Sequence, residues 1–150
     1  LLYRAYKKSV REQKNAAERV DEIMERNRII EEIKGEETNN QTIFIEMQSK
    51  ILKSDIFKNS NYNRENIVAC TGLSRSKVIS LIELFTGLTP NEYINKLRVE
   101  HSVKLFHEHP DWTIDAIAEE CGYVRRATFY SHFNKLFGIT PAQYRKQRKE

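Results

Sequence analysis

The chain has 150 residues, of which 39% are hydrophobic and 31% are charged, with a formal net charge of +4. This length allows one hydrophobic core or two small ones. No apolar run is long enough to span a bilayer and no signal peptide is evident, so we expect no membrane-spanning class. With five glycines and three prolines, long helices meet few interruptions. We expect a small, soluble, mainly helical protein whose basic charge suits a polyanionic partner.

Residues 1–34 are predicted to form one helix with an apolar seam at alternating spacings of three and four. In heptad terms, Val20 and Asn27 occupy a positions, whereas Ile23 and Ile30 occupy d positions. An asparagine at an a position lowers stability but favours a parallel pair of helices, because its amide bonds to its symmetry mate. These four residues therefore predict either a dimerising coiled coil or, as the alternative, a solvated linker helix.

The first eight residues combine an apolar and aromatic start with a basic cluster that ends at Lys8. This order is similar to the cytoplasmic edge of a membrane span. A membrane-anchored or sensor region upstream is one hypothesis, and the ordinary start of an amphipathic helix is the other. Because the chain does not begin with Met, we expect it to be part of a longer protein.

A polar stretch at residues 35–41, which contains Gly35, Asn39 and Asn40, predicts a linker. A second domain is then expected over residues 42–150. Its first core helix is predicted over residues 42–57, where apolar side chains recur at helical spacing. These are Ile43, Phe44, Met47, Ile51, Leu52 and Phe57.

Two stretches in the second domain are near-copies of each other. The copies begin at Ile67 and Ile117. Each has a glycine five residues later and a second glycine that one residue separates from a Thr-Pro pair. The first glycines are 50 residues apart and the second glycines are 51 apart, so one residue is inserted. Each copy has the layout of a helix-turn-helix: a short apolar helix, a turn with glycine, and a second helix that ends at glycine.

Helix starts are marked by side chains that can cap them. Asn63, Ser74 and Thr113 are predicted N-caps, and in the second copy Val124 stands where we expect the counterpart of Ser74. Two stronger signals have Pro at the first helical position and a capping box, and these are Thr89 to Glu92 and Thr140 to Gln143. The helix from Pro90 to about His107 would be about 27 Å long and would separate the two copies.

The second helix of the second copy is predicted to begin at Val124 and to bury Phe129, Phe133, Phe137 and Leu136. Its outer face would then carry Arg125, Arg126, Thr128, Ser131 and His132. Arginine can donate two parallel hydrogen bonds to guanine, and Thr or Ser can bond to a base or contact a thymine methyl group. This face has the chemistry needed to read base edges, although each charged residue alone could equally be part of a solvated helix face.

The corresponding helix of the first copy is expected to bury Val78, Ile82 and Phe85. Its outer face would carry Arg75, Ser76, Lys77, Ile79, Ser80 and Leu81. Ile79 and Leu81 cannot bond to polar base edges. We therefore expect phosphate contacts from Arg75 and Lys77, and most of the sequence discrimination from the second copy.

Catalytic and metal-binding constellations are not found in the sequence. The four histidines lack metal-ligand spacing with the cysteines, and there is no Gly-rich phosphate loop or nucleophile elbow. Cys70 and Cys121 are predicted to be buried free thiols, which is typical of a reducing compartment and hence of the cytoplasm. We expect no enzyme, no metal and no cofactor.

Three motifs in the second copy are more specific than its layout: Ile-Ala-Glu-Glu-Cys-Gly-Tyr at 117–123, the series Phe129, Phe133 and Phe137-Gly138, and Thr140-Pro141 followed by Tyr144-Arg145. With them, residues 42–148 resemble the DNA-binding domain of AraC/XylS-type bacterial transcription regulators. The resemblance implies a seven-helix, all-α domain with two helix-turn-helix units joined by a long central helix. It also implies that two recognition helices enter successive major grooves of promoter DNA, and that RNA polymerase is a partner.

Position by position, the resemblance implies which side chains face the bases. These are Ser76, Ile79 and Ser80 in the first unit, and Arg126, Ala127, Thr128 and Ser131 in the second. The helix over residues 1–34 is similar to the region that joins membrane-anchored sensor or tetratricopeptide-repeat portions to such domains.

A helical protein-interaction module with a weak or vestigial DNA face is the alternative function. Binding through Lys and Arg should weaken steeply as salt rises, whereas an apolar protein contact should change little. RNA is disfavoured because its deep, narrow major groove does not accept a reading helix.

Overall fold

A computed structural model describes residues 1–149, apart from the side chain of Ile56. Within this range the chain consists of helices, with no β-strand, which confirms the predicted all-α class. In chain order the elements are α1 (Leu2–Ser54), the short 3-10 helix η1 (Ile56–Lys58), α2 (Arg64–Thr71), α3 (Arg75–Thr86), α4 (Pro90–Glu108), α5 (Ile114–Glu120), α6 (Arg126–Phe137) and α7 (Pro141–Lys149). None of the helices in this described part has the length and apolarity of a membrane span.

The chain divides into two compact units, residues 1–42 and the residues from Ile43 onward. The predicted linker at 35–41 does not interrupt α1, so the expectation of two separate helices on either side of it is wrong. The Thr38 hydroxyl donates to the carbonyl oxygen of Lys34 at 2.9 Å, and the Thr42 hydroxyl donates to that of Thr38 at 3.1 Å. These bonds satisfy the hydroxyl groups within the helix. Gly35 alone costs about 1 kcal/mol relative to Ala, which does not end a helix rich in Glu and Lys.

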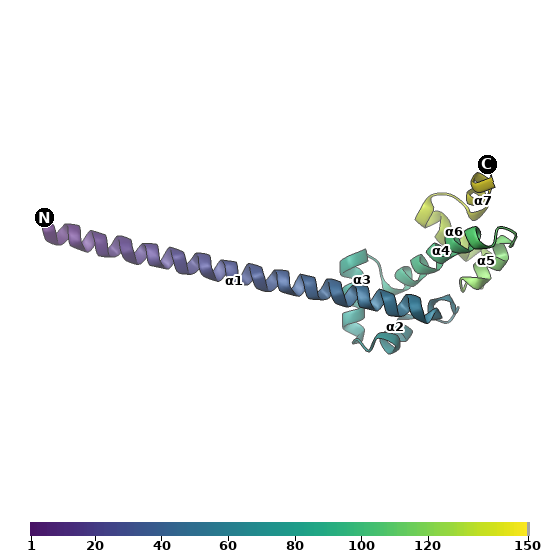
Figure 1. Ribbon diagram of the computed structural model, residues 1–150, viewed down its shortest axis with the longest axis horizontal. Coiled ribbons are helices and arrows are strands. Elements are labelled where there is room, and N and C mark those ends of the chain that lie inside the picture. Colours follow the sequence, from purple (N-terminus) through teal and green to yellow (C-terminus); the bar gives the residue numbers. More distant parts are fainter. Residues whose placement is uncertain (150) are drawn as a thin grey trace. The chain divides into compact units, whose positions relative to one another are not determined.

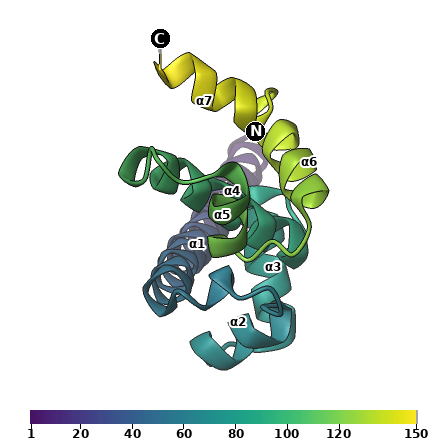
Figure 2. The same cartoon turned by 90° about the vertical axis from the view of Figure 1, so that its right-hand side faces the viewer.

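Two clusters of buried side chains lie along α4 in the second unit. The first joins the end of α1, α2 and α3 to the beginning of α4, and the second joins the rest of α4 to α5 and α6. Figures 1 and 2 show α2 and α3 beside one part of α4, and α5 and α6 beside another. The first cluster includes Phe44, Met47, Ile51, Ile67, Val78, Leu81, Ile82, Tyr93, Ile94 and Leu97, and the second includes Val99, Leu105, Phe106, Ile117, Ala118, Cys121, Tyr123, Phe129 and Phe133.

The predicted helix caps are confirmed. Thr89 and Glu92 form a capping box at the start of α4, because the Thr89 hydroxyl accepts from the Glu92 backbone and the Glu92 carboxylate accepts from the Thr89 backbone. Thr140 and Gln143 exchange the same two bonds. Asn63, Ser74 and Thr113 each accept a backbone N–H from the first turn of their helices. The sequence therefore determines where five of these helices begin.

Several expected core positions need correction. Leu81 is only 1% exposed rather than outside, because it completes the i, i+3, i+4, i+7 stripe with Val78, Ile82 and Phe85. Leu52, by contrast, is 49% exposed. In α6, Phe129 and Phe133 are fully buried as predicted, whereas Leu136 and Phe137 are 39% and 44% exposed. Leu136 and Phe137 are the last two residues of α6 and are not part of the buried cluster that covers Phe133.

Candidate nucleic-acid interface

The two helix-turn-helix units, α2–α3 and α5–α6, have second helices of matching length. Both α3 and α6 have 12 residues, begin with an arginine and end before a glycine. Arg75 therefore corresponds to Arg126, at an offset of 51 residues. The inserted residue lies in the turn before α6, so the N-cap is Arg125 rather than Val124, and α6 begins two residues later than expected. No side chain caps α6, and Val124 is 85% exposed.

The N-cap and the outer face of α6 carry five of the predicted DNA contacts. Opposite this face, Phe129 and Phe133 are fully buried and fix the rotation of the helix. The five residues are all exposed, and they are Arg125, Arg126, Ala127, Thr128 and Ser131. The structure thus brings together two guanidinium groups, two hydroxyl groups and one small apolar side chain that are accessible to a ligand.

Arg126 is held by two side chains that the sequence reading missed. One nitrogen of its guanidinium donates to the Tyr130 hydroxyl at 2.9 Å, and another donates to Asp115 Oδ2 at 3.3 Å. The guanidinium also lies over the Tyr130 ring, 5.0 Å from its centre. The bond to Tyr130 and the nearby Asp115 raise the pKa of Arg126 above its ordinary value, so its positive charge is secure.

His132 does not lie on this outer face, which corrects the predicted position. It is half-buried, and its Nδ1 is 3.1 Å from the Tyr123 hydroxyl. At the offset of 51 residues between the two copies, His132 corresponds to Leu81, which is buried in α3. The same side of α6 is therefore expected to face the core. Burial lowers the pKa of His132 below its ordinary value, so we expect a neutral ring at pH 7.

The outer face of α3 is less charged. Arg75, Ser76 and Ser80 are exposed, whereas Lys77 and Ile79 are partly covered. Ser76, Ile79 and Ser80 line one shallow hollow together with Glu83 and Leu84. All three side chains that the resemblance assigned to base contact in this unit therefore share one surface.

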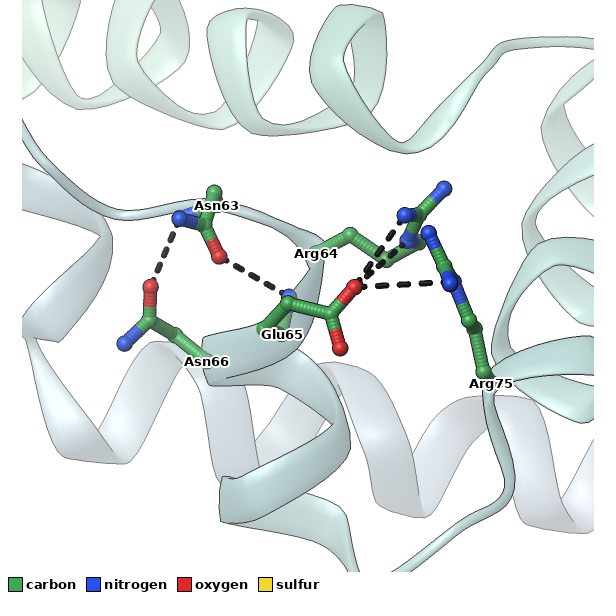
Figure 3. A network of polar contacts seen from close by, with 5 residues as sticks. All are labelled: Asn63, Arg64, Glu65, Asn66 and Arg75. Carbon is green, nitrogen blue, oxygen red and sulfur yellow. Dashed lines mark hydrogen bonds and ion pairs between the residues drawn. The ribbon is translucent and has the colours of Figure 1, made fainter.

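Arg75 also has an acidic partner on the preceding helix. Its Nε lies 3.5 Å from Glu65 Oε1, which accepts from Arg64 as well, at 3.1 Å. Figure 3 shows one oxygen of the Glu65 carboxylate facing both guanidinium groups, which lie side by side, near the Asn63 and Asn66 cap of α2. Glu65 could have been found from the sequence, since it lies 50 residues before Asp115 in the aligned copies.

The described residues contain no group of three or more His, Cys, Asp or Glu side chains arranged to hold a metal ion. The site therefore consists of basic, hydroxyl and small apolar side chains on two helices that are fixed to a common third helix. That arrangement defines a double helix-turn-helix domain.

Comparison with known proteins agrees with this class. Residues 67–147 match the family model described as a helix-turn-helix domain, and the chain belongs to the AraC/XylS-type helix-turn-helix family. The chain is 26% identical over 86 residues to the HTH-type transcriptional regulator MtrA of Neisseria gonorrhoeae, covering 57% of this chain and 28% of that protein. It is 29% identical over 108 residues to the lactose operon transcription activator of Staphylococcus xylosus, covering 66% of this chain and 38% of that protein.

Among solved structures, the fold resembles the C-terminal domain of AraT, a response regulator from Geobacillus stearothermophilus. The TM-score is 0.59 at 26% identity, and the match covers 70% of this chain and 84% of that one. The chain spans about a third of the length of the curated relatives named above.

Proposed function

We propose that this chain is the DNA-binding part of a sequence-specific transcription regulator, and that α3 and α6 enter successive major grooves of promoter DNA. The observation that carries the proposal is the pair of equivalent helices, each starting with an exposed arginine and each packed on α4. With 19 residues, α4 is about 28 Å long. Successive major grooves on one side of B-DNA are about 34 Å apart, which a helix of this length can span together with the side chains at its ends.

The proposal is tested by selecting bound duplexes from a random DNA pool with the 150-residue chain. Enrichment of one sequence with two conserved blocks about one helical turn apart would support it. Recovery of unrelated duplexes, with no shared sequence after repeated rounds, would contradict sequence-specific reading.

Two substitutions separate base contacts from phosphate contacts. Arg126→Ala should lower affinity for the selected duplex by roughly ten- to a hundred-fold and relax the preference at one base pair. Lys77→Ala should weaken binding to selected and random duplexes alike. Lys104→Ala, which removes an exposed lysine of α4, is the control for loss of one positive charge. An equal loss on both duplexes for Arg126→Ala would contradict a base-reading role.

The alternative, a protein-interaction module, is favoured by one observation: Leu84 is 61% exposed and borders the hollow that contains Ile79. The dependence of binding affinity on salt concentration distinguishes the two functions. DNA binding through several Lys and Arg contacts should weaken steeply between 50 and 200 mM salt, roughly in proportion to the number of phosphate contacts. Binding that is insensitive to salt would favour the alternative.

We also propose that α1 forms a parallel homodimer through the seam of Val20, Ile23, Asn27 and Ile30. Val20, Ile23 and Ile30 are 54%, 49% and 41% exposed in the single chain. On the side of the helix opposite this seam, Arg28 contacts Glu25 at 2.7 Å and Glu32 at 2.8 Å. An apolar a/d seam with charged side chains on the opposite face is typical of a coiled coil.

The dimer is tested by the mass of the chain in sedimentation equilibrium. The wild-type chain should sediment as a dimer, and Asn27→Ile should shift it toward larger assemblies, because Asn at an a position selects two strands. Asn15→Ile changes an exposed asparagine outside the seam and serves as the control. A monomer for both the wild-type chain and Asn27→Ile would contradict the coiled coil.

In a longer protein, we expect this domain to act with RNA polymerase and with an upstream sensor or membrane-anchored region. Its relatives named above are about three times as long as the matched segment. We also propose a cytoplasmic location, which the proposed role on promoter DNA and the two free cysteines support. We assign it no catalytic activity. Co-purification of the full-length protein with RNA polymerase on promoter DNA tests the first partner.

A further inference from the structure

The same ion pair occurs in both helix-turn-helix units. Glu65 is the second residue of α2 and contacts Arg75, the first residue of α3, at 3.5 Å. Asp115 is the second residue of α5 and contacts Arg126, the first residue of α6, at 3.3 Å. In each unit an acidic side chain from the first helix therefore contacts the arginine that begins the second helix.

Stability does not account for these pairs. The arginine side chains are 62% and 60% exposed, and both carboxylates are 60% exposed. Ion pairs exposed to this degree contribute little to folding, because water and salt screen them and two long side chains must be ordered. The cap of α2 is also complete without the Glu65 carboxylate, since Asn63 and Asn66 provide both bonds of the capping box.

A carboxylate at this place has two effects on an arginine that faces DNA. It fixes the direction of the guanidinium, which otherwise rotates freely on its long side chain and contacts any nearby phosphate. It also repels phosphate groups, which lowers the affinity for DNA of any sequence. Base edges in the major groove carry no net charge, so a base contact avoids most of this repulsion.

We propose that Glu65 and Asp115 are positioning residues that determine specificity, by holding Arg75 and Arg126 for base contact at the expense of contact with phosphates. For Arg75, this role replaces the phosphate contact that the sequence predicts. This inference depends on the proposed DNA-binding function. Neither carboxylate needs to touch DNA.

The two units differ in how firmly the arginine is held. Arg126 has a second anchor, because Tyr130 provides both a hydroxyl acceptor at 2.9 Å and a ring under the guanidinium. The residue that corresponds to Tyr130 in the first unit is Ile79, which can provide neither. Glu65 also forms an ion pair with Arg64, so its charge is shared between two arginines (Figure 3). The effect on specificity is therefore expected to be larger for Asp115 than for Glu65.

The test measures the ratio of affinities for two probes, a duplex enriched from the random pool by the wild-type chain and a random-sequence duplex of the same length. Asp115→Asn keeps the size of the side chain and removes its charge. It should raise affinity for the random duplex by about three- to ten-fold, as expected for one added phosphate contact, and should lower the ratio by at least that factor. Asp115→Glu, which restores the charge, should restore most of the ratio. Glu65→Gln should lower the ratio less than Asp115→Asn does.

A double-mutant cycle with Arg126→Ala shows whether Asp115 acts through Arg126. In the Arg126→Ala background, Asp115→Asn should leave the ratio unchanged within about two-fold. A wild-type ratio for Asp115→Asn would overturn the inference, and so would an equal change with and without Arg126. A merely structural role would lower the melting temperature and weaken binding to both probes by the same factor, and this outcome would also overturn the inference.

If Arg126→Ala itself leaves the ratio unchanged, the proposed base-reading function fails as well. If Arg126→Ala lowers the ratio and Asp115→Asn does not, only this inference fails.

Discussion

Arg98, in the middle of α4, donates a hydrogen bond from its Nε to the carbonyl oxygen of Phe57 at 2.8 Å. A second guanidinium nitrogen donates to the carbonyl oxygen of Asn59 at 2.7 Å. Arg98 is only 8% exposed, and burial lowers its pKa below the ordinary value. One buried cation thus satisfies the backbone of the segment that follows α1, and it binds this segment to α4.

Replacing Arg98 with Ala should lower the free energy of unfolding by about 2–4 kcal/mol, because the buried carbonyl oxygen of Phe57 and the partly buried one of Asn59 lose their donor. Urea denaturation followed by circular dichroism measures the change. Lys96→Ala is the control, since Lys96 is more exposed and has only an ion pair with Glu100 at 3.6 Å. Equal effects of the two substitutions would contradict the structural role of Arg98.

Gly122 should not tolerate a side chain. Its φ is +90°, and a Cβ atom at this position would lie 2.3 Å from the carbonyl oxygen of Lys58. We expect Gly122→Ala to cost about 3 kcal/mol or more, from backbone strain together with the clash. Gly72→Ala is the matched control, since Gly72 has a φ of +71° with open space around it, and it should cost about 1–2 kcal/mol. Comparable thermal unfolding of both variants would rule out the clash.

The core of the second unit should depend on Phe133 far more than on Phe137. Phe133 is fully buried and packs edge-on against Phe106 and Phe129, whereas Phe137 is 44% exposed. Phe133→Ala should lower stability by about 3–5 kcal/mol, and Phe137→Ala by about 1 kcal/mol. Denaturant midpoints of the two variants check this order, and the reverse order would mean that the α6 face is assigned wrongly.

The two cysteines should differ in reactivity. Burial raises the pKa of the Cys121 thiol from its ordinary value of 9.0 to about 12. Cys70 is partly exposed, so the prediction that both cysteines are buried is wrong for this one. Native protein at pH 8 should therefore be alkylated at Cys70 and protected at Cys121, as peptide mass mapping would reveal. Protection of both thiols, or of neither, would be inconsistent with this packing.

The same thiol makes a contribution to stability that depends on pH. Below about pH 9 the thiol is protonated in both the folded and the unfolded state. Between about pH 9 and 12 only the unfolded state loses this proton, so stability should fall as pH rises. Cys121→Ala should make this fall shallower in urea melts at pH 8 and 10.5, and an unchanged slope would contradict the prediction.

Local signals in the sequence were sufficient to predict most of the helix starts. Asn63, Thr89 and Thr140 cap helices because their side chains and the residues three positions later interact within one turn. The repeat likewise predicted equivalent second helices. These features depend on neighbours in the chain, which a single sequence contains.

Features that depend on distant neighbours were missed. The buried Leu81 and the half-buried His132 were predicted to lie on the outer faces of their helices, because a stripe drawn through three apolar residues is narrower than the covered face of a helix. The contacts of Arg126 with Asp115 and Tyr130 need the angle between α5 and α6, and composition does not reveal it. Continuity of α1 through Gly35 was also missed, since local breaker residues were given more weight than the helix formers around them.

The bonds from Arg98 have a mechanical consequence for the second helix-turn-helix unit. Lys58, between the two residues that Arg98 binds, also lies directly against Gly122 in the turn between α5 and α6. The segment that follows α1 is therefore tied both to α4, through Arg98, and to that turn, through Lys58. A movement of this segment would then reach the second helix-turn-helix unit through Arg98 and Lys58, alongside the first unit, whose α2 and α3 share a buried cluster with the end of α1.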